Sequence, residues 1–393
     1  MSIKSNFSFI GILLVTAGIL VASNIYTLIP LYSSIGNSFS SNEQALSFAS
    51  FIFTFCYAFG LLCFGPISDK IGKKTVMTWG MLFASISTFF IYVSSNLFEL
   101  YLFRGLQGFA LASFAPVAFS YSFDLYTPRA RTFWLALINS GFLAAGIIGQ
   151  LISSVINSYF SWFEVFLFFC VCYLMLFICF LSYLPNTKNT NVHSKENVLV
   201  IMYKLLTDQL LRKCYLIVFT ILFSFVAFYD AMTSLELSPS ELFFIRSVGL
   251  IGVILSIYTG KLIKKFSYLK TLIIGILLAL ISVCSLMILT STIWMAIFSI
   301  MFVSSISLLI PTLITLIGDF SEKNKGKALS LYSFILLLGA SLSSIIANFF
   351  SYTTVLLILL IFFIINLILS YKIHKDLNKG SVMSIRPTFN KSQ

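Results

Sequence analysis

Long apolar runs alternate with short polar segments along most of this chain. A helix needs about 20 mostly apolar residues to cross a bilayer, and twelve runs in the 393-residue sequence come close to that length. They fall near residues 8–32, 44–66, 75–94, 99–123, 132–156, 161–184, 214–235, 242–260, 271–290, 293–317, 328–350 and 352–371. The pattern predicts an all-α polytopic membrane protein with two sets of six spanning helices.

The widest polar interval separates these two sets. It reads PNTKNTNVHSKENVLVIMYKLLTDQLLRK at 185–213, polar at first and then amphipathic, which is compatible with a short helix on the membrane surface. We therefore expect an N-terminal six-helix bundle at 1–184, a cytoplasmic linker at 185–213, a C-terminal six-helix bundle at 214–372 and a cytoplasmic tail at 373–393.

The basic residues predict the orientation of the chain. Cytoplasmic loops of membrane proteins collect Lys and Arg. If the N-terminus lies inside, all but two of the 25 basic residues fall on inner segments, the exceptions being Arg104 and Arg246. Both termini are thus expected to be cytoplasmic. The net charge of +12 then follows from topology, and it predicts a lipid bilayer rather than a nucleic acid as the partner.

Composition excludes several other classes of protein. Charged residues make up 10% of the chain, whereas soluble domains carry roughly 25%. The seven cysteines show no metal-ligand spacing, and the two histidines, His193 and His374, lie on the linker and the tail. No Walker sequence for binding ATP is present. We expect no metal, no cofactor and no enzymatic activity, because a membrane-embedded transferase needs clustered His, Asp or Glu at one face.

Two polar segments recur at equivalent places in the halves. GPISDKIGKK begins at Gly65 and GKLIKKFSYLK at Gly260, each between the second and third helix of its half. DLYTPRARTFWLAL begins at Asp124 and DFSEKNKGKALSL at Asp319, each between the fourth and fifth helix. Internal repeats of this kind are common in transporters and indicate two pseudo-symmetric bundles.

The chain resembles the major facilitator superfamily. Its signature between helices 2 and 3, G-x-x-x-D-[RK]-x-G-[RK]-[RK], is met here by Gly65, Asp69, Lys70, Gly72, Lys73 and Lys74. Arg104 and Gln107 in YLFRGLQG resemble the R-x-x-Q-G element of helix 4. The glycines of SGFLAAGIIGQ are similar to helix 5 of proton-linked exporters, although Ile147 stands where a proline is usual; they are Gly141, Gly146 and Gly149. Within the superfamily, the likeness is to drug:proton antiporters and bacterial YnfM-type exporters.

The resemblance implies alternating access driven by a proton gradient, in a monomer of a bacterial cell membrane. It implies a cytoplasmic gate in which Asp69 caps the eleventh helix of the opposite half while neighbouring basic residues pair with Asp124. A solvated positive loop would explain the lysines but not the flanked Asp69. For Arg104, the resemblance implies proton coupling or binding of an anionic substrate; the alternative is a structural arginine bonded to carbonyl groups.

Charged residues within the spans are the remaining candidates for a site. A charge at the centre of a spanning helix costs at least about 2.5–3.5 kcal/mol, so Arg104 is expected to face a cavity and to have a partner. Asp230 is the one acid placed well within a span, and we expect it to accept a proton or to bind a substrate amine. Asn24 and Tyr26 of the first helix join this predicted site. Glu236, Glu241 and Arg246 lie nearer the outer mouth, as an external gate or as interfacial charges.

The expected function is proton-coupled export of small molecules, either by a broad multidrug pump or by a dedicated exporter of a zwitterionic or carboxylate metabolite, such as an opine-type metallophore. A non-transporting membrane sensor with the same fold is the alternative from another class, and it would tolerate neutral substitutions at Asp69 and Asp230.

Overall fold

Twelve helices long and apolar enough to cross a membrane are present in the computed structural model, which describes residues 3–187, 198–235, 237–289, 291–321 and 324–380. The predicted all-α polytopic fold is therefore confirmed. The first half contains α1 (Ile3–Tyr26), η1 (Ile29–Leu31), α2 (Tyr32–Phe39), α3 (Glu43–Ile71), α4 (Lys73–Tyr92), α5 (Leu97–Leu111), α6 (Ala115–Leu125), α7 (Pro128–Tyr159) and α8 (Trp162–Tyr183). The linker contains α9 (Val198–Thr207). The second half contains α10 (Gln209–Ala231), η2 (Met232–Ser234), α11 (Pro239–Gly249), η3 (Leu250–Tyr258), α12 (Thr259–Phe266), α13 (Tyr268–Ile288), α14 (Thr292–Phe320), α15 (Lys325–Phe349) and α16 (Tyr352–Gly380).

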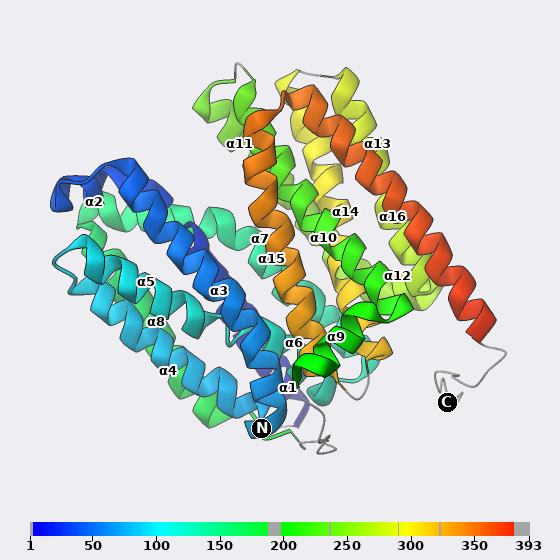
Figure 1. Ribbon diagram of the computed structural model, residues 1–393, viewed down its shortest axis with the longest axis horizontal. Coiled ribbons are helices and arrows are strands. Elements are labelled where there is room, and N and C mark those ends of the chain that lie inside the picture. The colour runs from blue at the N-terminus through cyan, green and yellow to red at the C-terminus, as the bar shows by residue number, and fades with distance from the viewer. Residues whose placement is uncertain (1–2, 188–197, 236, 290, 322–323, 381–393) are drawn as a thin grey trace.

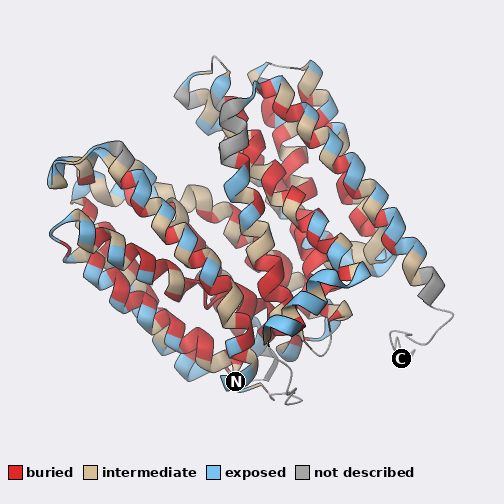
Figure 2. Cartoon of the chain, viewed as in Figure 1, coloured by how far each residue is buried: buried red, intermediate tan, exposed pale blue. Residues whose placement is uncertain are grey.

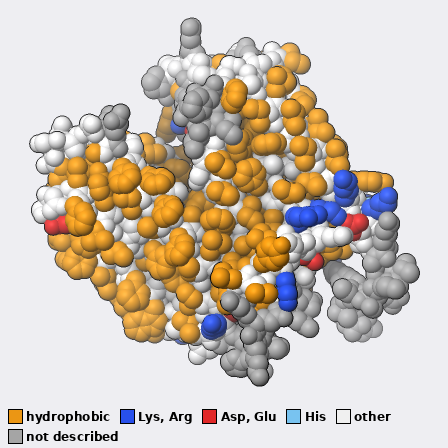
Figure 3. Space-filling view, viewed as in Figure 1, with side chains coloured by type: hydrophobic (Ala, Val, Ile, Leu, Met, Phe, Trp, Pro, Cys, Tyr) orange, Lys and Arg blue, Asp and Glu red, His pale blue; other side chains and the backbone are white. Residues whose placement is uncertain are grey.

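The two halves form two lobes that meet at one end (Figure 1). They converge where α6 and α9 lie, and they diverge toward the end that carries α2 and α11. The converging end bears the inner, Lys-rich segments. Buried residues are concentrated inside each lobe and where the lobes meet (Figure 2). Large apolar side chains cover the outward faces (Figure 3), among them Phe55, Phe59 and Phe83, as expected of surfaces that contact lipid.

Two prolines explain where the structure departs from the predicted runs. Proline lacks an N–H, and its ring clashes with the carbonyl group four residues earlier. Accordingly α1 ends at Tyr26, four residues before Pro30, rather than continuing to residue 32. The fourth span is likewise broken between Leu111 and Ala115, ahead of Pro116 at the start of α6.

The eighth span is the least regular. It is built from α11, the 3-10 segment η3 and α12, and it extends to Phe266 rather than to the predicted residue 260. A side chain at Gly252 would meet the backbone of α14, with Ser304 N at 2.7 Å. The irregular stretch thus lies where the eighth span packs closely against the tenth.

The linker contains the surface helix with which its sequence is compatible, but the linker is shorter than 185–213. Helix α10 begins at Gln209 because Asp208 caps it: its carboxylate accepts hydrogen bonds from Leu210 N and Leu211 N at 3.0 and 2.9 Å. Capping by an acidic side chain satisfies backbone donors that otherwise have no partner within the helix. Residues 209–213 therefore belong to the seventh span.

Glycines set the distance between neighbouring helices, and Gly108 shows this for α3 and α5. A β-carbon on Gly108 would lie 3.0 Å from the carbonyl carbon of Phe53 and closer still to its oxygen. At Gly260 in α12, by contrast, the nearest atoms would be 3.8 Å away, an ordinary contact. Only the first position requires a residue without a side chain.

We expect Gly108→Ala to lower the melting temperature of the purified protein in detergent. Overpacking costs typically about 1–3 kcal/mol, which outweighs the gain in helix propensity of up to about 1 kcal/mol that alanine brings to any helix interior. Gly260→Ala is the matched control and should melt at or slightly above the wild-type temperature. Equal melting temperatures for the two variants would contradict the close packing of α3 on α5.

Candidate functional site

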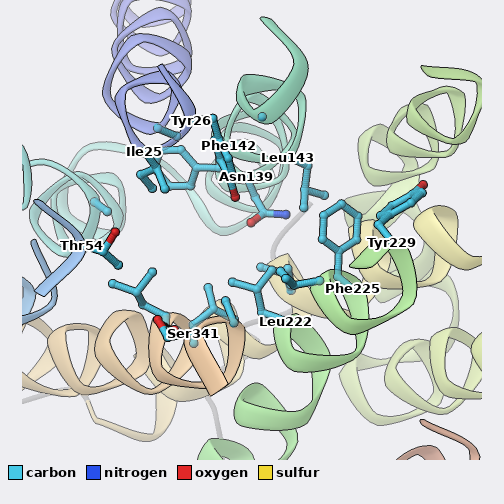
Figure 4. A pocket seen from close by; sticks show the side chains of 18 of the residues that line it. Ile25, Tyr26, Thr54, Asn139, Phe142, Leu143, Leu222, Phe225, Tyr229 and Ser341 are labelled. Carbon is cyan, nitrogen blue, oxygen red and sulfur yellow. Dashed lines mark hydrogen bonds between the residues drawn. The ribbon is translucent and has the colours of Figure 1, made fainter. Parts of the chain in front are cut away.

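A cavity of about 470 Å³ lies between the two lobes (Figure 4). Eight of the spans contribute to its wall, four in each half, so neither half forms it alone. It is lined by Ala22, Ile25, Tyr26, Ile29, Thr54, Tyr57, Leu61, Ala115, Phe119, Asn139, Phe142, Leu143, Gly146, Ile147, Gln150, Leu222, Phe225, Val226, Tyr229, Asp230, Arg246, Leu250, Ile310, Ser333, Leu336, Leu337, Ala340 and Ser341. Most of this wall is apolar, which suits an amphipathic guest.

The charged groups of the cavity come from the second half. Asp230 lies near the end of α10 and Arg246 on α11, and both line the cavity. Arg246 Nη2 donates to Tyr229 O at 3.0 Å, which ties the guanidinium to the backbone next to Asp230. The first half contributes neutral polar groups instead, including Tyr26 and Asn139. The structure therefore brings predicted residues Tyr26, Asp230 and Arg246 to one cavity.

Of the three residues predicted at the outer mouth, the structure describes Glu241 and Arg246, and these two lie in different surroundings. Arg246 turns into the cavity, as described above. Glu241 closes a capping box at the start of α11, where its carboxylate accepts from Ser238 N at 2.9 Å, and Thr292 Oγ1 also donates to it at 2.9 Å. Glu236 lies outside the described residues. Glu241 thus anchors the start of α11 and the neighbouring α14.

Arg104 does not face the cavity, contrary to expectation. It is fully buried inside the first half, and the lining residues named above do not include it. Its Nη1 donates to Gln107 Oε1 at 2.6 Å and its Nη2 to Asn24 O at 3.1 Å. The guanidinium also lies 4.1 Å from the centroid of the Phe53 ring, a cation–π contact.

Gln107 and Asn24 belong to the same hydrogen-bonded cluster as Arg104. Gln107 Nε2 donates to Asn24 Oδ1 at 3.0 Å and to Thr88 Oγ1 at 2.7 Å, and Asn24 Nδ2 donates to Tyr173 OH at 2.5 Å. These bonds join four spans, because the side chains come from α1, α4, α5 and α8. The geometry matches the alternative reading of Arg104 as a structural arginine, while any coupling role for it stays a prediction.

The inner ends of the lobes touch where α3 meets α15. Lys327 Nζ lies 3.5 Å from Asp69 Oδ2, and a β-carbon on Gly326 would be 2.6 Å from Asp69 Cγ. On Gly65, a β-carbon would be 2.9 Å from Ser330 Cβ. Asp69 therefore lies at the N-terminal end of α15, where the helix dipole favours an anion.

The other residues of the 65–74 motif support this contact from within the first half. Gly72 has φ +101° and joins α3 to α4, a conformation that side chains disfavour. Lys73 Nζ lies 2.5 Å from Asp124 Oδ2, and Lys74 Nζ donates to Leu181 O at 2.9 Å. Lys70 is exposed.

A second ion pair joins the two lobes, between α7 and α14. Arg131 Nη2 in α7 lies 3.0 Å from Asp319 Oδ1 in α14. Above it, Ser140 and Ser256 share a hydrogen bond between α7 and η3. The sequence analysis placed Asp319 at the position equivalent to Asp124 but did not predict that Asp319 pairs with Arg131 of the other half. The hint in the sequence was that Arg131 lies on the same inner segment as Asp124.

Two of the three predicted glycines of α7 face α1, and the third faces the cavity. A β-carbon on Gly149 would be 2.6 Å from Ser23 O, and one on Gly141 would be 2.9 Å from Ile19 Cγ1, so both allow α7 to lie close to α1. Gly146 faces the cavity beside Tyr26, at ordinary contact distance.

Comparison with known proteins agrees with this architecture. The model of the Major Facilitator Superfamily matches residues 14–343 and 247–386. An uncharacterized transporter of Buchnera aphidicola subsp. Schizaphis graminum (strain Sg) is 29% identical over 354 residues, which cover 86% of this chain and 84% of that protein. The inner membrane transport protein YnfM of Escherichia coli (strain K12) is 31% identical over 156 residues, 40% of this chain and 37% of YnfM.

A solved structure supports the fold. The crystal structure of the Major Facilitator Superfamily transporter FucP in the outward conformation superposes with a TM-score of 0.76 at 15% identity, over 94% of this chain and 99% of FucP. Together with the twelve spans and the cavity between two lobes, these matches show that the chain is a multi-pass membrane protein that belongs to the Major Facilitator Superfamily of secondary transporters.

Proposed function

We propose that the protein exports small amphipathic molecules in exchange for protons, by alternating access of the cavity between its lobes. The observation that carries the proposal is the placement of Asp230 and Arg246 in a largely apolar cavity whose inner side is closed by contacts between the halves. Export rather than import is supported by the glycines of α7, which resemble those of proton-linked exporters.

Asp230 is the proposed proton site. A carboxylate in an apolar wall loses hydration, which favours its neutral form, whereas a nearby guanidinium favours the charged form. These opposing influences suit a group that takes up a proton on the outer side and gives it up on the inner side. A substrate amine competing for the same carboxylate would couple the two flows.

The charges also bear on the range of substrates. A purely cationic guest would lie near Arg246 and be repelled by it, whereas a zwitterion could place its carboxylate near Arg246 and its ammonium group near Asp230. This arrangement favours a dedicated exporter of a zwitterionic or carboxylate metabolite over a broad multidrug pump.

The proposal predicts that cells expressing the protein accumulate at least one endogenous compound outside, relative to cells with an empty vector. Comparing the small molecules inside and outside both cultures by mass spectrometry measures this. A protonophore should abolish the difference. An unchanged difference would contradict proton coupling, and no difference for any compound would favour the non-transporting sensor.

We expect Asp230→Asn to reduce that export at least tenfold, because an amide cannot take up and release the proton. Asp208→Asn is the matched control: it changes the same residue type in the cap of the same helix, where asparagine serves as well as aspartate, and it should export normally. Full export by Asp230→Asn would exclude Asp230 as the proton site.

The contact between Asp69 and Lys327 should be needed for the cycle and should depend on charge. Removing one member of a largely buried pair leaves the other charge without compensation. We therefore expect Asp69→Asn and Lys327→Gln each to slow export about tenfold, which corresponds to roughly 1.4 kcal/mol. The exchanged variant carrying Asp69→Lys and Lys327→Asp should recover part of the rate, and a variant no better than the single changes would argue against the ion pair.

A further inference from the structure

Asn139 and Arg246 each bring to the cavity a buried side-chain nitrogen that has no hydrogen-bond partner among the described residues, and Asn139 is the neutral one of the two. Asn139 lies on α7, is 2% exposed and lines the cavity. Its side-chain nitrogen is buried and has no hydrogen-bond partner among the described residues. A buried donor without a partner costs about 1–3 kcal/mol of folding stability. A ligand that accepts a hydrogen bond from this donor would recover that cost.

Other polar side chains of the same wall are already bonded within the protein. Gln150 Nε2 donates to Gly146 O at 2.8 Å, and Thr54 Oγ1 donates to Ser50 O at 2.9 Å. The Tyr229 hydroxyl shares a hydrogen bond of 2.8 Å with Ser299 Oγ. Unlike these groups, the Asn139 side-chain nitrogen has no hydrogen-bond partner among the described residues.

The surroundings of Asn139 strengthen any bond made there. Phe142 and Leu143 flank it on α7, and Leu222 and Phe225 of α10 lie across from it (Figure 4). In such an apolar setting a hydrogen bond is electrostatically stronger than in water. Asn139 follows the start of α7 by eleven residues, about 16 Å along the axis, which places it near the middle of the bilayer.

We propose that Asn139 is a substrate-recognition residue, whose side-chain amide donates a hydrogen bond to a carbonyl or carboxylate oxygen of the transported molecule. The inference rests on the proposed function and specifies its substrate class: an amphipathic molecule with an oxygen acceptor held by the first half and a charged group held by the second. The apolar body lies between, against Phe142 and Phe225.

Two related probes test this: phenylalaninamide is phenethylamine with a carboxamide added on the carbon that bears the amine. Phenethylamine and phenylalaninamide share an ammonium group and a phenyl ring, but only the second has a carbonyl oxygen. Binding is measured as the rise in melting temperature of the purified full chain in detergent, over a range of ligand concentrations, because a ligand of the folded state stabilises it by an amount set by its concentration and affinity.

We expect the wild type to bind phenylalaninamide at least tenfold more tightly than phenethylamine. Asn139→Leu, of similar size but without the donor, should bind the two probes equally and should melt at or above the wild-type temperature when no ligand is present. Asn157→Leu is the matched control: Asn157 is on the same helix outside the cavity, and its Nδ2 donates to Ser34 Oγ at 2.9 Å. That control should keep the tenfold preference even if it melts lower.

Three results would overturn the proposal: a wild type without preference for the carbonyl-bearing probe, a preference that survives Asn139→Leu, or an unliganded Asn139→Leu protein that melts well below the wild type. The last would mean that the amide supports the fold. Because the binding assay does not depend on protons or direction, export can fail in cells while the preference for the carbonyl persists, and the reverse can also occur, so the two failures are distinguishable.

Discussion

The close approach of α3 and α15 at the inner surface is the contact on which the cavity depends. Gly65 and Gly326 leave no side chains between the two helices, and only then can Asp69 reach the first turn of α15 and Lys327. A second contact joins the lobes between α6 and α15, where the rings of Phe119 and Tyr332 lie 6.0 Å apart. These contacts hold the inner ends of the two lobes together.

The second constraint is the free-energy cost of placing a charged side chain inside a membrane. The two arginines within the spans meet this constraint in different ways. Arg104 is surrounded by protein acceptors and an aromatic ring, so its charge finds its partners inside the first half. Arg246 donates a hydrogen bond to the backbone carbonyl of Tyr229 and lines the cavity. Two arginines with the same intrinsic chemistry therefore differ in surroundings because of the direction in which each helix face points.

This difference also marks how far the sequence could predict the structure. Span number and orientation depend on hydrophobicity and on Lys and Arg placement, both local properties, and the predicted twelve spans agree with the structure. The breaks before Pro30 and Pro116 follow from local chemistry that the apolar runs concealed. Helix rotation against partners distant in sequence decides that Arg104 points away from the cavity. It also decides that Asn139 and Arg246 line the same cavity. No spacing within a single helix contains that information.

The asymmetry of the cavity has a consequence for transport. The charged groups belong to α10 and α11, whereas the proposed amide donor belongs to α7, so a guest that uses both would hold the two lobes together. If the lobes moved apart on the inner side, the guest would keep its contacts with one lobe, and its contacts with the other lobe would lengthen. A carboxylate oxygen separated from Asn139 loses one bond in an apolar site, but the salt-like contact with Arg246 remains. If Asn139 binds the substrate as proposed, affinity would then differ between the two faces chiefly through the amide, and a neutral residue would control where a charged molecule is released.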